Sequence, residues 1–160
     1  MTADQPTRQY LDTLLRYYEE EIEGEAYFNG IADRLGGPDH QAKMRLMARV
    51  ETYAAATVYP LISKYGLAPK PVADLHVSGK AQAAKETTDW SELIDKMRKI
   101  FPGYIDDFER LEAMAPKEDL RELTILTAHE WAAIAFLERE ASGDPDSDRP
   151  MRHYLETGTA

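Results

Sequence analysis

The sequence predicts an all-α protein, a four-helix bundle with one long crossover between its second and third helices. Apolar side chains recur every three or four residues in four long stretches, which is the period of an α-helix. Short breaks join the first stretch to the second and the third to the fourth, whereas residues 66–88 carry no sustained period. Two helical hairpins joined by a connection of this length are typical of a bundle with one crossover.

The first two helices are expected over residues 7–35 and 39–65. Pro6 suits the first turn of a helix, because proline has no N–H group to leave unpaired there. The sequence Gly36-Gly37-Pro38 is a strong stop between the two helices. Gly66 ends the second helix. This pair therefore forms a hairpin with a tight turn.

The third helix is expected to begin at Asp89, since Asp89 and Glu92 form an Asp-x-x-Glu start signal. Pro102-Gly103 interrupts its apolar stripe and predicts a bend. The fourth helix follows Pro116 and ends at Ser142-Gly143. These two helices form the second hairpin.

The bundle is expected to occupy residues 1–143. Within the crossover, residues 66–88, one short helix is predicted over residues 81–85. Residues 144–160 begin with the acidic segment DPDSD and are expected to form a linker and tail, on the surface or against a neighbouring subunit.

Composition excludes several classes of function. The chain of 160 residues suits one domain, and it contains no cysteine for disulfides, thiolate metal sites or a cysteine nucleophile. A formal net charge of -10 disfavours nucleic acid and anionic membrane surfaces. No apolar stretch approaches the length of a membrane helix, and the first ten residues lack a signal-peptide pattern. We therefore expect a cytoplasmic protein.

Acidic residues occupy positions on the apolar stripes. Glu51 and Glu130 each follow the helical spacing of buried residues. Glu21 and Glu25 lie 16 and 12 residues before Gly37, and Glu51 lies 14 after it. Since helices rise about 1.5 Å per residue, these three lie at about the same height in an antiparallel hairpin. We expect their carboxylates to form a buried cluster.

Such a cluster needs a partner, because a lone buried carboxylate is costly. It could be a metal site, a proton relay, or a hydrogen-bonded polar layer in the core. Carboxylates brought close together raise one another's pKa, so one would hold a proton if no cation is present. Tyr18, Tyr53 and Tyr104 are candidate donors, and a metal-free network is favoured.

Two further residues are candidates at lower rank. Tyr104 of the third helix is level with Glu130, so Asp107, one turn away, is the nearest carboxylate on that helix. His129 precedes Glu130 and should point about 100° away from it around the helix. We therefore expect His129 to miss the cluster and to lie at the surface or in an interface.

The stretch Glu21-Ile22-Glu23-Gly24-Glu25-Ala26-Tyr27-Phe28 resembles the first-helix motif of the ferritin-like, rubrerythrin-related superfamily. Glu51 and Glu130 stand where that family carries Glu-x-x-His in its second and fourth helices. The resemblance covers roughly residues 8–140. It implies a ferritin-like four-helix bundle whose carboxylates and histidines hold two iron ions.

The family's ligand set is incomplete in this sequence. Ala54 and Ala133 stand in place of the two histidines, and the third-helix glutamate is missing. The resemblance thus leaves Glu21 or Glu25, with Glu51 and Glu130, as ligands. Three carboxylates could still bind Mn, Mg or Ca, but iron loses both nitrogen donors.

Three functions remain open from the sequence. The leading interpretation is a bundle with a largely lost metal site and no favoured cofactor, binding a small apolar molecule or serving assembly as a homodimer. The alternative is a metal-dependent oxidoreductase that uses iron or manganese at Glu21, Glu25, Glu51 and Glu130, with Asp107 or His129. A third is a cofactor-free enzyme with Glu51 or Glu130 as general base.

Overall fold

A computed structural model describes residues 5–160 as seven α-helices and one 3-10 turn, and this part of the chain contains no strand. The prediction of an all-helical protein is confirmed. The elements in chain order are α1 (Arg8–Arg34), α2 (Pro38–Lys64), α3 (Val72–Ala83), α4 (Trp90–Ile100), α5 (Pro102–Met114), the 3-10 turn η1 (Lys117–Asp119), α6 (Leu120–Ala141) and α7 (Arg149–Thr157).

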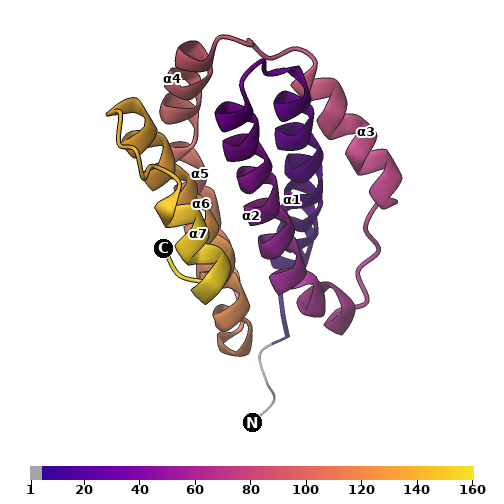
Figure 1. Ribbon diagram of the computed structural model, residues 1–160. Helices are drawn as coiled ribbons and strands as arrows, with labels where there is room; N and C mark the ends of the chain where they lie inside the picture. Colours follow the sequence, from indigo (N-terminus) through magenta and orange to yellow (C-terminus); the bar gives the residue numbers. More distant parts are fainter. Residues whose placement is uncertain (1–4) are drawn as a thin grey trace.

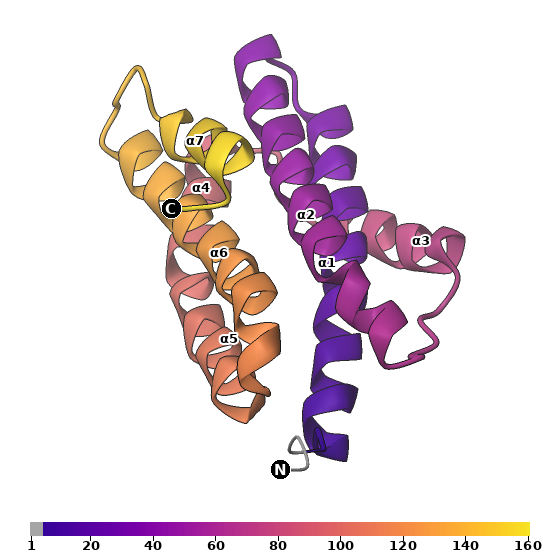
Figure 2. The same cartoon turned by 90° about the horizontal axis from the view of Figure 1, so that it is seen from below.

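Two helical hairpins face each other across the core. α1 and α2 lie side by side and antiparallel, and α5 and α6 form the second pair (Figures 1 and 2). α2 packs against α6, and α1 contacts α5. The interior is filled by fully buried side chains from both hairpins and from α4, including Leu14, Met47, Val58, Leu93, Leu126 and Phe136.

Local signals in the sequence determine several helix ends. The Thr7 side chain accepts a hydrogen bond from the Tyr10 N–H at 3.1 Å, and Asp89 does the same for the Glu92 N–H at 3.0 Å. Pro38 opens α2. Each cap satisfies an N–H group that has no partner inside its helix, so these helices begin close to where the sequence predicts them.

The predicted bend at Pro102-Gly103 is a break between two helices. α4 ends at Ile100, and α5 begins at Pro102, whose missing N–H is tolerated in a first turn. Phe101 lies at the junction and is half-buried. The break places side chains from both helices around one cavity, described below.

The crossover contains a longer helix than the one predicted over residues 81–85, and that prediction is wrong in position. α3 begins at Val72 and packs against α1. Its buried side is the short series Leu75, Gly79 and Ala83, spaced by four residues. Gly79 lies so close to the backbone carbonyl of Glu23 that a Cβ atom would collide with it. Small residues make this stripe weakly apolar, which is why the periodic signal is faint.

The C-terminal segment is part of the core, so the prediction of a surface tail is wrong. α7 packs against α2 and α6, and its side chains Met151 and Tyr154 are fully buried. The Tyr154 hydroxyl donates a hydrogen bond to the Ile125 carbonyl at 3.0 Å. These two residues are spaced by three, so one apolar face of a nine-residue helix suffices to cover α6.

Across residues 5–160, none of the helices combines the length and the apolar character needed to cross a membrane.

Candidate functional site

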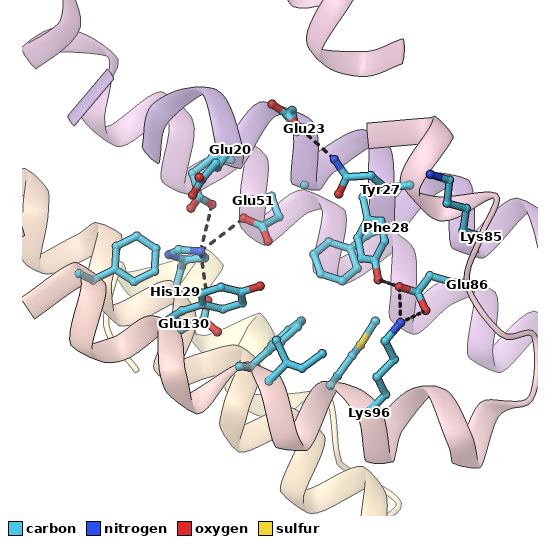
Figure 3. A pocket seen from close by; sticks show the side chains of 18 residues that line it. Glu20, Glu23, Tyr27, Phe28, Glu51, Lys85, Glu86, Lys96, His129 and Glu130 are labelled. Carbon is cyan, nitrogen blue, oxygen red and sulfur yellow. Dashed lines mark hydrogen bonds and ion pairs between the residues drawn. The ribbon is translucent and has the colours of Figure 1, made fainter. Parts of the chain in front are cut away.

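Four side chains from three helices meet, and three of them are buried while Glu51 is nearly so. Glu21 comes from α1, Glu51 from α2, and His129 and Glu130 from α6. The His129 Nε2 atom lies 3.0 Å from Glu21 Oε2, 3.3 Å from Glu51 Oε2 and 3.8 Å from Glu130 Oε2 (Figure 3). We call these four residues the carboxylate–histidine cluster.

The imidazole of His129 is held from several sides. Its Nδ1 atom hydrogen-bonds the backbone carbonyl of Leu126, one turn earlier on α6. Because a carbonyl oxygen only accepts, Nδ1 carries a proton, and Nε2 is the atom presented to the carboxylates. The rings of Phe108 and Tyr154 flank it, with centroids 5.3 Å and 6.5 Å away. The ring is thus oriented before any ligand binds.

Burial and mutual charge shift the titration of the cluster. Burial would lower the pKa of His129, but the charges of Glu21 and Glu51 outweigh it and raise that pKa well above its usual value. Burial and the neighbouring charge of Glu51 raise the pKa of Glu21 well above the ordinary range. Burial opposes ionisation of Glu51, yet its contacts with Glu21 and His129 lower its pKa.

Glu130 is the most isolated member of the cluster. Burial raises the pKa of Glu130 to about 8, with His129 opposing this shift and Glu51 adding to it. Its Oε1 atom has no hydrogen-bond partner among the residues that the structure describes. Glu21 Oε2 is likewise without a hydrogen bond there, although it lies 3.0 Å from His129 Nε2 in an ion-pair contact. Two buried oxygens therefore remain available to a ligand.

A cavity of about 700 Å³ adjoins the cluster, with Glu21, Glu51, His129 and Glu130 all on its wall. Its remaining lining comes from α1, from α4 and α5, and from the segment after α3. Aromatic and aliphatic side chains, among them Phe28, Met97 and Phe108, form much of its surface. This volume lies within the range of about 300–1,000 Å³ that is typical of small-molecule sites.

Gly24 makes space for one of the carboxylates. A Cβ atom on Gly24 would lie 3.0 Å from Cδ and 3.1 Å from Oε1 of Glu51. Such distances are tighter than ordinary van der Waals contact, so a side chain here would displace the Glu51 carboxylate. A glycine one turn after Glu21 lets α1 and α2 present both carboxylates to the same point.

Among the residues predicted from the sequence, Glu25 lies outside the cluster. The structure brings Glu21, Glu51 and Glu130 together through His129. Glu25 instead lies 3.5 Å from His76 of α3, as measured between Oε2 and Nε2, beside a separate small pocket. Glu21 and Glu25 are one helical turn apart on α1, yet Glu21 faces the core and Glu25 faces α3.

The other predicted partners do not hydrogen-bond the cluster carboxylates. Tyr18 packs against Tyr59, and Tyr53 packs against Tyr154. Asp107 is half-exposed and pairs with a neighbour on its own helix. Tyr104 lines the cavity, where burial and the charge of Glu130 raise the pKa of its hydroxyl.

The prediction that His129 misses the cluster and lies at the surface is wrong. The side chain is 2% exposed, and it is the centre of the cluster. α6 packs against α2, α4, α5 and α7, so the consecutive residues His129 and Glu130 are both buried. The apolar pair Met151 and Tyr154 in the tail was the signal that could have revealed this packing of α7 on α6.

Comparisons of the chain with protein-family models, with curated proteins and with solved structures find no match. The chemistry of the cluster and its cavity therefore carries the functional argument.

Proposed function

We propose that the protein binds one divalent transition metal, iron or manganese, through Glu21, Glu51 and His129, and acts as a metal-dependent oxidoreductase on a small molecule in the adjoining cavity. One observation carries this proposal. A ligand atom from each of these three residues lies within 4.8 Å of the other two, and each residue is buried or nearly so. Atoms this close can share one ion.

The donor set suits such an ion. One imidazole nitrogen with carboxylate oxygens is a common environment for iron and manganese in proteins. The hydrogen bond from Nδ1 of His129 to the Leu126 carbonyl is the arrangement that typically orients a metal-binding histidine. Bound iron or manganese would supply redox chemistry and Lewis acidity beside the cavity.

The residues present fit one ion better than the two ions implied by the family resemblance. Ala54 and Ala133, which are buried, replace the two histidines of the family pattern. His129 supplies a nitrogen from a different position of the fourth helix. We infer a ferritin-like four-helix bundle with its crossover over residues 66–88, rebuilt around a single-metal site.

Titration of the metal tests this function. Protein stripped with EDTA is titrated with MnCl₂, and with Fe²⁺ under anaerobic conditions, by calorimetry. We expect one ion per chain, and about a 100-fold weaker affinity in Glu51→Gln and His129→Gln, since each loses a direct ligand. Glu25→Gln is the matched control, because it removes a carboxylate near Glu21 but outside the cluster. Equal affinity in Glu51→Gln and Glu25→Gln would contradict the proposal.

A second candidate is a metal-free binding or assembly module. It is favoured by the positive charge of His129, which already pairs with Glu21 and Glu51. In that case the same titration shows no metal binding in the wild-type protein. Assembly as a homodimer and a cytoplasmic location remain predictions from the sequence.

A further inference from the structure

The cavity continues beyond the carboxylate–histidine cluster along a wall of aromatic rings. Tyr27 and Phe28 of α1 have centroids 5.0 Å apart. Phe28 lies 6.2 Å from Phe101, and Phe101 lies 6.0 Å from Tyr104 at the α4–α5 break. All four rings line the cavity. They form a continuous row of π faces and edges beside the cluster.

Acidic side chains outnumber basic ones around the same cavity. Six glutamates line it, against two lysines and His129. Lys96 is already occupied, because its Nζ atom contacts Glu86 Oε1 at 2.9 Å and Oε2 at 2.7 Å (Figure 3). The Tyr27 hydroxyl donates to Glu86 Oε1 at 2.7 Å. A bound divalent ion would not reverse this balance, so an anionic molecule is disfavoured.

The buried end of the cavity offers an acceptor. The side chain of Glu130 is 7% exposed, it lines the cavity, and its Oε1 atom has no hydrogen bond within residues 5–160. An unpaired buried carboxylate oxygen is costly, and a donor supplied by the occupant would relieve that cost. A positively charged N–H donor does so best, since charge-assisted hydrogen bonds are the strong ones.

We propose that this cavity binds a small arylalkyl- or alkylammonium ion, with its ammonium group at Glu130 and its apolar part along the wall of Tyr27, Phe28, Phe101 and Tyr104. The inference rests on the proposed function in that it names the class of molecule held beside the metal. Aromatic faces attract cations through their quadrupole, most strongly where water is excluded. The aromatic wall and the unpaired Glu130 oxygen thus both favour an N–H donor that carries a positive charge.

Three probes of similar shape test the proposal, namely 2-phenylethylamine, 2-phenylethanol and 3-phenylpropionate. Each is titrated into the full-length protein by calorimetry at pH 7, both stripped of metal and loaded with Mn²⁺. We expect the amine to bind about tenfold tighter than the alcohol, and the carboxylate to bind weakest, because cation–π contacts and a charged hydrogen bond favour the amine. Equal or tighter binding of the alcohol or the carboxylate would overturn the proposal.

Two variants locate the effect. Glu130→Gln keeps the shape of the side chain and should remove most of the preference for the amine over the alcohol. Phe101→Leu keeps an apolar wall and should weaken amine binding about threefold while changing alcohol binding little. Glu109→Gln, which alters an exposed carboxylate of α5, is the matched control and should bind like the wild type. An amine preference that survives in both Glu130→Gln and Phe101→Leu overturns the proposal.

The metal titration and the probe titration can refute the two proposals independently of each other. If the amine preference appears in protein that binds no metal, the proposed metal function is wrong and the ligand class stands. If one Mn²⁺ binds per chain and the amine shows no preference, the ligand class is wrong and the metal function stands.

Discussion

The molecule buries carboxylates at two places, and the cost of burying their charge is met differently at each. Asp119, in the turn before α6, is fully buried and accepts three hydrogen bonds, at 2.7 Å from Tyr10, 2.6 Å from Tyr65 and 2.7 Å from Lys64. Burial opposes its ionisation, but the hydrogen bonds from Lys64, Tyr65 and Tyr10 lower the pKa of Asp119. The fold therefore satisfies the hydrogen-bonding requirement of this carboxylate with its own side chains.

In the carboxylate–histidine cluster, by contrast, the fold does not supply every carboxylate oxygen with a hydrogen-bond donor. Glu130 is almost as buried as Asp119, yet one of its oxygens is unpaired among the described residues, and its pKa is raised to about 8. Both groups join distant helices. The difference teaches that buried charge alone does not indicate function, whereas buried charge with an unmet hydrogen-bonding requirement, beside a cavity, does.

The largest expected effect is on stability, at Asp119. Replacement of Asp119 by alanine leaves the buried Tyr10 hydroxyl and the Lys64 ammonium without their acceptor. We expect the free energy of unfolding to fall by about 3 kcal/mol, as when one partner of a buried pair is removed. Urea denaturation measures it. Tyr65→Phe removes one donor and should cost only about 1 kcal/mol. Similar losses in the two variants would contradict the view of Asp119 as the centre of this network.

A smaller effect is expected on the cluster side, at Gly24. Gly24→Ala places a methyl group against the Glu51 carboxylate and should displace it. We expect metal affinity to fall about tenfold, which is about 1.4 kcal/mol. Calorimetric titration with Mn²⁺ measures it, and the thermal midpoint should change little because alanine favours the helix. Unchanged affinity would show that the position of Glu51 does not depend on this close approach.

The hydrogen bonds that Asp119 accepts from Tyr10, Lys64 and Tyr65 should also make the stability of the protein depend on pH. A carboxyl group whose pKa is lowered in the folded protein contributes stability above its ordinary pKa, near 3.8 for Asp119, and this stability is lost as the pH falls through the lowered pKa. The wild type should therefore lose more stability than Asp119→Asn as the pH falls from about 5 to about 2.5, because only the wild type carries the titrating carboxyl group. Urea denaturation across this range measures both proteins. If the free energy of unfolding of the two proteins changes with pH in the same way, the lowered pKa of Asp119 is contradicted.

The smallest effect on stability is expected at Glu130. Glu130→Met replaces a partly unsatisfied carboxyl group by an apolar side chain of similar length. We expect the free energy of unfolding of the metal-free protein to change by less than about 1 kcal/mol, or to rise, because an unpaired polar group is removed from the core. A loss as large as that of Asp119→Ala would show that Glu130 is as structural as Asp119, and the contrast between the two groups would disappear.

Local patterns predicted much of this molecule. Thr7, Asp89 and the Gly36-Gly37-Pro38 stop act within one or two turns of their own helices, so their effects can be read without a partner. Glu21 and Glu51 lie at similar distances before and after the tight turn at Gly37, and this spacing also places them at one level of the hairpin. Glu25, one turn from Glu21, was not distinguished from it, because the direction of α3 is not a local property.

The amino-acid sequence by itself determined the helical class, the main helix boundaries and the presence of acidic residues on apolar stripes, since these depend on contacts between residues close in the chain. Only the tertiary structure decided that His129 is the centre of the cluster. That outcome depends on α7, whose Tyr154 lies beside the His129 ring and helps to cover α6. Helical periodicity defines one buried face, whereas packing between distant segments decides how many faces are covered and which polar groups meet inside.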